Sequence, residues 1–142
     1  MKLLPLSFQT PEENLAFEEW YFQKFEEETL RIWVNPESVI VGKHQNAFSE
    51  SNQVYCKEHN IQIIRRISGG GTVYHDSGNL NFSFFRKLDH VHQIEYDNNL
   101  DVIKTALQKL GYDVKTSLRH DLYLNEKKIS GNAQHISKGK SL

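Results

Sequence analysis

The chain has 142 residues, and its 17 lysines and arginines nearly balance 18 aspartates and glutamates, which leaves a formal net charge of −1. A dedicated nucleic-acid binder normally carries a basic surplus, so that class is disfavoured. The hydrophobic fraction of 38% excludes collagen-like, coiled-coil and disordered chains, and the length suits one domain. Cys56 has no second cysteine with which to form an internal disulfide, which fits a reducing compartment. The sequence has neither a membrane-spanning apolar run nor a targeting segment, so we expect a cytoplasmic protein that binds no membrane and no nucleic acid.

The first strong structural signal is a helix start at residues 10–13. Thr10 can cap the helix, Pro11 suits its first turn, and Glu13 completes a capping box. The residues that follow at helical spacing form one mostly aromatic stripe, which we expect to face the core. The stripe consists of Phe17, Trp20, Tyr21, Lys24 and Phe25.

The remaining elements mix strands and helices without a regular βαβ alternation, which favours an α+β fold. Two strands, 30–34 and 39–41, flank a turn at 35–38, and a short helix over 50–59 closes at Asn60. Strands are predicted at 61–66, 80–85 and 112–116, and a hairpin at 121–129 turns around Asn125-Glu126. A helix over 98–110 ends at Gly111, and we expect one of its faces to be buried. That face comprises Val102, Ile103, Ala106, Leu107 and Leu110.

The segment from Arg65 to Asn79 carries the clearest chemical signal, because four of the eight glycines of the chain lie between positions 69 and 78. Glycines let a backbone approach a ligand closely and direct N–H groups at anionic oxygens. Arg65 and Arg66 supply positive charge and paired donors for phosphate or carboxylate. The segment is neither a P-loop nor a Rossmann fingerprint. An anion site on a sheet is one interpretation, and a glycine-rich hairpin loop with solvated arginines is the other.

A second candidate segment runs from Lys127 to Ala133. A strand lysine followed by Ser130-Gly131 could stabilise developing negative charge beside a bound ligand, but two adjacent lysines also suit an exposed hairpin edge. His75 beside Asp76 suggests a catalytic dyad, yet no serine or cysteine nucleophile stands out, so we favour a structural histidine. Without an H-E-x-x-H motif or a cysteine pair, the sequence predicts no metal site.

These segments together resemble the lipoate–protein ligase A family of the biotin/lipoate ligase superfamily. Residues 41–46 (VGKHQN) resemble the family's early Gly-x-x-Gln-Asn segment, and residues 65–79 resemble its central R-R-x-x-G-G-G-x-V-x-H-D-x-G-N signature. Residues 127–133 resemble its K-[IV]-S-G-x-A motif. The resemblance spans nearly the whole chain and implies a catalytic domain with helices packed on a mixed or antiparallel sheet.

The resemblance also implies a reaction: lipoate and ATP give lipoyl-AMP and pyrophosphate, and the lipoyl group passes to a lysine of an acceptor protein. The implied acceptors are lipoyl domains of 2-oxoacid dehydrogenase E2 subunits and the glycine-cleavage H protein. Mg²⁺ would arrive with ATP. By position, the implied ATP-binding residues are Arg66, Gly71, Thr72, Val73, Tyr74 and Lys128. The implied lipoate-binding residues are Lys128, Arg65, Ser68, Gly70 and His75, and Lys128 would be the catalytic residue.

The chain departs from the family pattern in two places. It has His120-Asp121 where the family usually has Asn-Asp, and it ends before the family's later strand and accessory domain. We therefore expect residues 1–142 to be an N-terminal catalytic portion: a truncated gene product, a fragment, or one half of a split ligase that a second polypeptide could complete. Two other functions stay open: an ATP-independent octanoyl- or lipoyltransferase with a cysteine nucleophile, and a non-catalytic subunit that binds lipoate or nucleotide.

Overall fold

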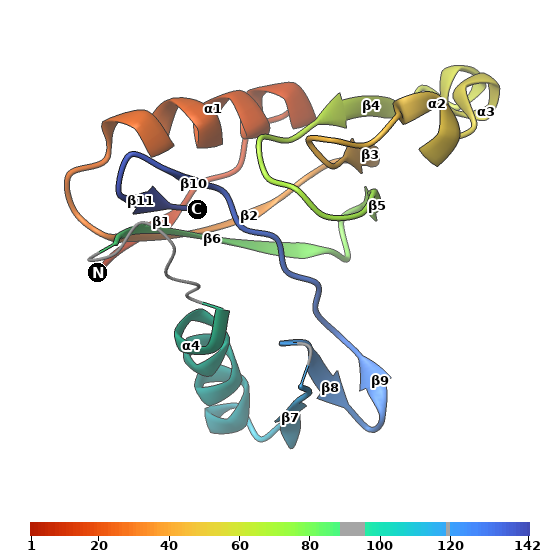
Figure 1. Cartoon of the computed structure of the whole chain (residues 1–142). Helices are drawn as coiled ribbons and strands as arrows, with labels where there is room; N and C mark the ends of the chain where they lie inside the picture. The colour runs from red at the N-terminus through yellow and green to blue at the C-terminus, as the bar shows by residue number, and fades with distance from the viewer. Residues whose placement is uncertain (89–95, 119) are drawn as a thin grey trace. The chain divides into compact units, whose positions relative to one another are not determined.

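A computed structural model describes residues 1–88, 96–118 and 120–142 (Figure 1). The chain forms two compact units, one made of residues 1–91 with 134–142 and the other of residues 92–133. Within the described residues, no helix combines the length and the apolar character needed to cross a bilayer. Both units mix helices and strands, which confirms the predicted α+β class.

The first unit contains two sheets and three helices among its described residues. The five-stranded sheet has the order β1-β2-β6-β11-β10, in which β1 and β2 are parallel and the other neighbours antiparallel. The three-stranded sheet has the order β4-β3-β5, with β3 parallel to β4 and antiparallel to β5. The strands are β1 (Lys2–Pro5), β2 (Thr29–Val34), β3 (Ser38–Val41), β4 (Gln62–Arg65), β5 (Val73–His75), β6 (Leu80–Lys87), β10 (Ile136–Ser137) and β11 (Lys140–Ser141). The helices are α1 (Pro11–Lys24), α2 (Ala47–Glu50) and α3 (Gln53–Glu58).

Helix α1 begins as its sequence predicts, but two members of the predicted buried stripe, Trp20 and Lys24, are exposed. Thr10 Oγ1 accepts from the Glu13 N–H, and the Glu13 carboxylate accepts from the Thr10 N–H, which completes the capping box. The core of this region joins Phe22 and Phe25 to Phe85 of β6. Trp20, assigned to the buried stripe, is 56% exposed. The stripe was wrong there because this helix is apolar on more than one side, and the packing against β6 decides which side is buried.

A buried arginine joins α1 to β2. Arg31 has no exposed surface, and its guanidinium donates to the carbonyl of Leu6 and to the backbone and side-chain oxygens of Asn14. The cation also lies 4.5 Å from the ring of Trp33 and 4.9 Å from that of Phe17. Burial lowers the pKa of Arg31 to about 10.

Several short elements of the first unit also differ from the sequence prediction. The helix predicted over 50–59 is instead two short helices, α2 and α3, capped by Asn46 and Asn52. Strands β1 and β5 and the β10–β11 hairpin were not predicted. Cys56 is buried, as expected for a core thiol.

The second unit packs α4 (Tyr96–Lys109) against a sheet of the order β7-β8-β9. Its strands are β7 (Val114–Thr116), β8 (Leu122–Leu124) and β9 (Lys127–Lys128), all antiparallel. Asn125 and Glu126 both have positive φ, which confirms the predicted tight hairpin turn. The predicted buried face of α4 is partly wrong. Leu100 forms the core with Val114 and Leu122, and Ile103 and Leu107 pack beside them, whereas Val102, Ala106 and Leu110 are exposed.

Candidate functional site

Arg65 holds the turn that follows β3. Its Nη1 donates to the carbonyls of Gly42 (2.8 Å), Lys43 (3.3 Å) and Gln45 (2.7 Å). This guanidinium group was predicted to offer donors to a bound anion, and in the structure those interactions go to the backbone of residues 42–45. Arg65 therefore shapes a loop, and its assignment to lipoate stays a prediction.

Arg66 holds the glycine-rich loop in the same manner. Its Nη2 donates to the carbonyls of Gly69 and Gly71, both at 2.7 Å, and its Nη1 donates to the carbonyl of Ile40. Its Nε donates to Ser68 Oγ (3.1 Å). Burial of this side chain lowers its pKa.

The hydrogen bonds from Arg66 to two carbonyls also determine in which direction the neighbouring N–H groups of the loop point. The described residues contain no cis peptide bond, and in a trans peptide the C=O and the following N–H point in opposite directions. Because the Gly69 and Gly71 carbonyls face the Arg66 guanidinium, the N–H groups of Gly70 and Thr72 point away from it. The N–H groups of Gly70 and Thr72 therefore lie on the side of the loop from which an anion could accept hydrogen bonds.

The loop glycines fall into two classes. Gly70 has a φ of 86°, which side chains rarely tolerate, and a Cβ added to Gly42 would lie only 2.0 Å from the Gly70 carbonyl oxygen. Gly69 and Gly71 have neither constraint, because a Cβ at either position would meet nothing within 4 Å. The free protein therefore requires glycine at 42 and 70, and it leaves open space over 69 and 71.

Ser68 and His75, both assigned to lipoate, are 9% exposed and engaged with neighbouring protein groups. Asn35 Nδ2 and His75 Nδ1 are 3.1 Å apart and share a hydrogen bond. Burial and the nearby Arg66 lower the pKa of His75. No hydrogen bond or ion pair joins Asp76 to the imidazole in the described structure, and Asp76 Oδ1 accepts from the Gly78 N–H. This arrangement supports the structural histidine over the dyad.

Val73 and Tyr74 continue from the loop into β5 and are exposed to 42% and 48%. A buried carboxylate also contributes to the electrostatics around Arg66. Glu18 of α1 accepts a very short hydrogen bond from Ser83 Oγ, and burial raises its pKa despite the nearby charges of Arg31 and Arg66.

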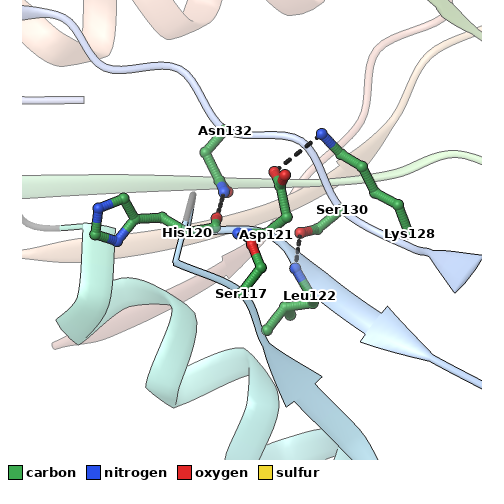
Figure 2. A network of polar contacts seen from close by, with 7 residues as sticks. All are labelled: Ser117, His120, Asp121, Leu122, Lys128, Ser130 and Asn132. Carbon is green, nitrogen blue, oxygen red and sulfur yellow. Dashed lines mark hydrogen bonds and ion pairs between the residues drawn. The ribbon is translucent and has the colours of Figure 1, made fainter. Parts of the chain in front are cut away.

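Lys128 lies in the second unit, paired with an acidic side chain that the sequence reasoning missed. Its Nζ is 3.0 Å from Asp121 Oδ1, and Figure 2 shows the two side chains directed at each other. The lysine side chain is 52% exposed, whereas that of Asp121 is only 14% exposed. The signal for this pair was in the predicted hairpin, since a turn at 125–126 brings residue 121 close to residue 128.

The rest of the 127–133 segment fastens the hairpin that carries Lys128 (Figure 2). Ser130 Oγ accepts from the Leu122 N–H (2.8 Å), and Asn132 Nδ2 donates to the His120 carbonyl in a very short contact. Ser130 and Asn132 are thus bonded to backbone groups of 120–122. The glycine-rich loop and Lys128 belong to different units, so their convergence on one ligand stays a prediction. Among the described residues, no group of three or more His, Cys, Asp or Glu side chains could hold a metal ion.

Comparison with known sequences identifies a matching family model and relatives that are named as lipoate–protein ligases or as a lipoyl amidotransferase. Residues 10–142 match the family model described as the lipoyl protein ligase A/B catalytic domain. Lipoate–protein ligase 1 of Staphylococcus aureus is 45% identical over 125 residues, which cover 87% of this chain and 38% of the relative. Lipoate-protein ligase LplJ of Bacillus subtilis is 42% identical, over 92% of this chain and 40% of the relative. The human mitochondrial lipoyl amidotransferase LIPT1 is 40% identical, over 89% of this chain and 35% of the relative. The chain thus spans about two fifths of the length of the curated relatives it matches.

Solved structures show the same likeness. Lipoate-protein ligase A bound with ATP superposes with a TM-score of 0.91 at 32% identity, over 99% of this chain and 63% of that one. A Thermoplasma acidophilum structure with bound lipoic acid gives a TM-score of 0.90 at 31% identity, over 99% and 63%. A bipartite lipoate protein ligase of the same organism, described with its E2 lipoyl domain, gives 0.87 at 33% identity, over 99% and 58%.

Proposed function

Since the chain belongs to the lipoyl protein ligase A/B catalytic-domain family, we propose that it activates lipoate with ATP and supports transfer of the lipoyl group to a protein lysine. In the first step, a lipoate carboxylate oxygen bonds to the α-phosphorus of ATP and pyrophosphate leaves. In the second step, the amine of the acceptor lysine attacks the lipoyl carbonyl, AMP leaves, and the amine loses a proton. Residues 1–142 would form the N-terminal catalytic portion.

The observation that carries this proposal is the form of the 69–72 loop. Arg66 turns the Gly69 and Gly71 carbonyls inward, and the N–H groups of Gly70 and Thr72 therefore face the opposite side. A Cβ placed at Gly69 or Gly71 meets nothing within 4 Å, and this open space would let a phosphate approach the backbone. A ligand that offers only a hydroxyl or a carboxylate would accept fewer hydrogen bonds from such a loop than a phosphate would.

Within the proposal, the nucleotide contacts Gly71, Thr72, Val73 and Tyr74. Arg66 supports the loop from the side that faces away from the nucleotide. Lys128 touches the lipoyl carboxylate and the α-phosphate, where a fixed ammonium group stabilises the charge that develops as pyrophosphate leaves. Asp121 holds that ammonium group before the ligands arrive. Arg65, Ser68, Gly70 and His75 form the surroundings of the lipoyl carboxylate. Arg65 acts there through the 42–45 turn that it holds, and Ser68 acts through its hydrogen bond to Arg66.

Mg²⁺ would neutralise the phosphates and enter with ATP, because the described residues offer it no dedicated ligand cluster. The proposed acceptors are lipoyl domains of 2-oxoacid dehydrogenase E2 subunits and the glycine-cleavage H protein. We also propose a cytoplasmic location and a second polypeptide that supplies the remaining part of the site. The bipartite Thermoplasma ligase provides a precedent for such a division.

The test is to incubate the purified chain with lipoate, Mg-ATP and an apo lipoyl domain, and to follow pyrophosphate and lipoylated product separately. Formation of both supports a complete ligase, and pyrophosphate without product supports an activating half. Absence of both, together with absence of any thermal stabilisation by lipoate or Mg-ATP, would refute the proposal.

A transferase is the second candidate, favoured by the 40% identity to human LIPT1, which is named a lipoyl amidotransferase. Acyl transfer from a preformed acyl donor without ATP would identify it. Ligand-dependent thermal stabilisation with no reaction of either kind would instead identify a binding subunit.

A further inference from the structure

We propose that Gln45 is a positioning residue that clamps the glycine-rich loop in its anion-binding form, an inference that rests on the proposed function for its ligand. Gln45 lies in the early Gly-x-x-Gln-Asn segment, for which the proposed reaction has given no role. Its side chain reaches residue 72, which is 27 positions away in the chain.

One oxygen atom of Gln45 joins the two segments. Gln45 Oε1 accepts from Thr72 Oγ1 (2.7 Å) and from the Gly42 N–H (3.2 Å). A backbone N–H can only donate, so it must be the amide oxygen, and not the amide nitrogen, that faces Gly42. The backbone of Gln45 is held as well, because its N–H donates to the Gly42 carbonyl (3.0 Å) and its carbonyl accepts from Arg65.

Two independent contacts show that the same segments are closely fitted. The Lys43 N–H donates to the Ser68 carbonyl (2.9 Å), which fixes the start of the loop. Gly42 lies so near Gly70 that a Cβ would come within 2.0 Å of the Gly70 carbonyl oxygen. The Thr72 bond to Gln45 fixes the far end of the loop, so the loop is tied at both ends to one turn.

The position of this clamp explains why a neutral acceptor is needed. The Thr72 N–H belongs to the side of the loop that faces away from Arg66, and the Thr72 hydroxyl is oriented by Gln45. A glutamate could accept the same two hydrogen bonds, but its charge would repel an anionic ligand at this loop. Glutamine supplies the acceptor without that charge.

The experiment compares Gln45→Ala, Gln45→Glu and the control Gln53→Ala, which removes another half-buried glutamine that bonds to Ala47 and Ser51. Amide hydrogen exchange at Lys43, measured by NMR in the ligand-free protein, reports whether the loop stays attached to the turn. Loss of the clamp should raise this exchange about tenfold in Gln45→Ala, because local opening becomes easier, and should leave it unchanged in the other two variants.

Calorimetric titration with Mg-ATP then separates the clamp from the ligand. Gln45→Ala and Gln45→Glu should both bind at least about tenfold more weakly than the parent, and added salt should reduce the defect of Gln45→Glu only. Unchanged Lys43 exchange in Gln45→Ala would overturn the inference, and so would parental Mg-ATP affinity in that variant. If the parent binds neither Mg-ATP nor lipoate, the proposed function fails, and Lys43 exchange in Gln45→Ala still decides whether the clamp exists.

Discussion

Replacing Gly71 with alanine is expected to separate folding from ligand binding. A Cβ at this position meets nothing within 4 Å, and Gly71 lacks the positive φ of Gly70. The free energy of unfolding should therefore stay constant or rise by about 0.4–1 kcal/mol, because alanine narrows the unfolded ensemble. If the backbone here lies against ATP, the same methyl group occupies space that the nucleotide needs. The Kd for Mg-ATP should then rise at least about tenfold, which corresponds to roughly 1.4 kcal/mol.

Gly42→Ala is the matched opposite case. Its Cβ would lie 2.0 Å from the Gly70 carbonyl oxygen, where ordinary contacts begin at 3.4 Å, so the two backbones must separate by roughly 1.4 Å. Overpacking of this kind costs about 1–3 kcal/mol. For a unit of this size, that cost lowers Tm by something on the order of 4–20 °C.

The assay pairs calorimetric unfolding with titration of Mg-ATP into each variant at a temperature where all of them are folded. Gly71→Ala should be stable and bind Mg-ATP poorly, whereas Gly42→Ala should be destabilised. Parental Mg-ATP affinity in Gly71→Ala, or a loss of stability in that variant as large as in Gly42→Ala, would contradict this expectation.

Three further predictions concern charged residues. Lys128→Ala should abolish pyrophosphate release and keep the fold. Lys127 is the adjacent residue of β9, and Lys127→Ala should retain activity. Near-normal pyrophosphate release from Lys128→Ala would contradict the role of the Lys128 amine. Arg66→Ala should weaken Mg-ATP binding by at least about tenfold, because the Gly69 and Gly71 carbonyls lose their donor; unchanged affinity in a titration would count against this. Burial raises the pKa of Glu18 above 4.5, so its contribution to stability is present below that pH and is lost as the pH rises through the raised value. Glu18→Gln should therefore be more stable than the parent at neutral pH in urea unfolding, and a less stable variant there would show that the carboxylate is needed in its charged form.

Local chemistry was the predictable part of the fold. The capping box at Thr10 and the turn at Asn125-Glu126 depend on residues within a few positions of each other, and both form as predicted. The buried face of α1 was not predictable in the same way, since Phe22 is covered by residues of β6 that are distant in sequence. The complete burial of Arg31 is a similar case, because its partners Leu6 and Asn14 are brought together only by the folded chain.

In the candidate site, too, local features were predictable and contacts between distant residues were not. The glycine-rich segment and the 127–133 segment could be found from the sequence, because unusual residue types are concentrated in them. The long-range partners could not, since Arg65 binds the Gly42 carbonyl 23 positions away and Gln45 binds Thr72 27 positions away. Arg65 and Arg66, which precede the glycines, were interpreted as donors to a ligand. In the described structure they donate to carbonyls of the chain instead.

This inward use of the arginines strengthens the case for an anion site. A loop carbonyl that faced the ligand would repel a phosphate, and Arg66 removes two such carbonyls, those of Gly69 and Gly71, by binding them on its own side. The same guanidinium also donates to the Ile40 carbonyl and to Ser68 Oγ, so one planar group serves four acceptors. Lysine has only three donors on a single atom and could not span these positions. Arg66→Lys should therefore keep the positive charge and still lose Mg-ATP affinity, and full affinity in that variant would mean that charge alone, without the fork of donors, is sufficient.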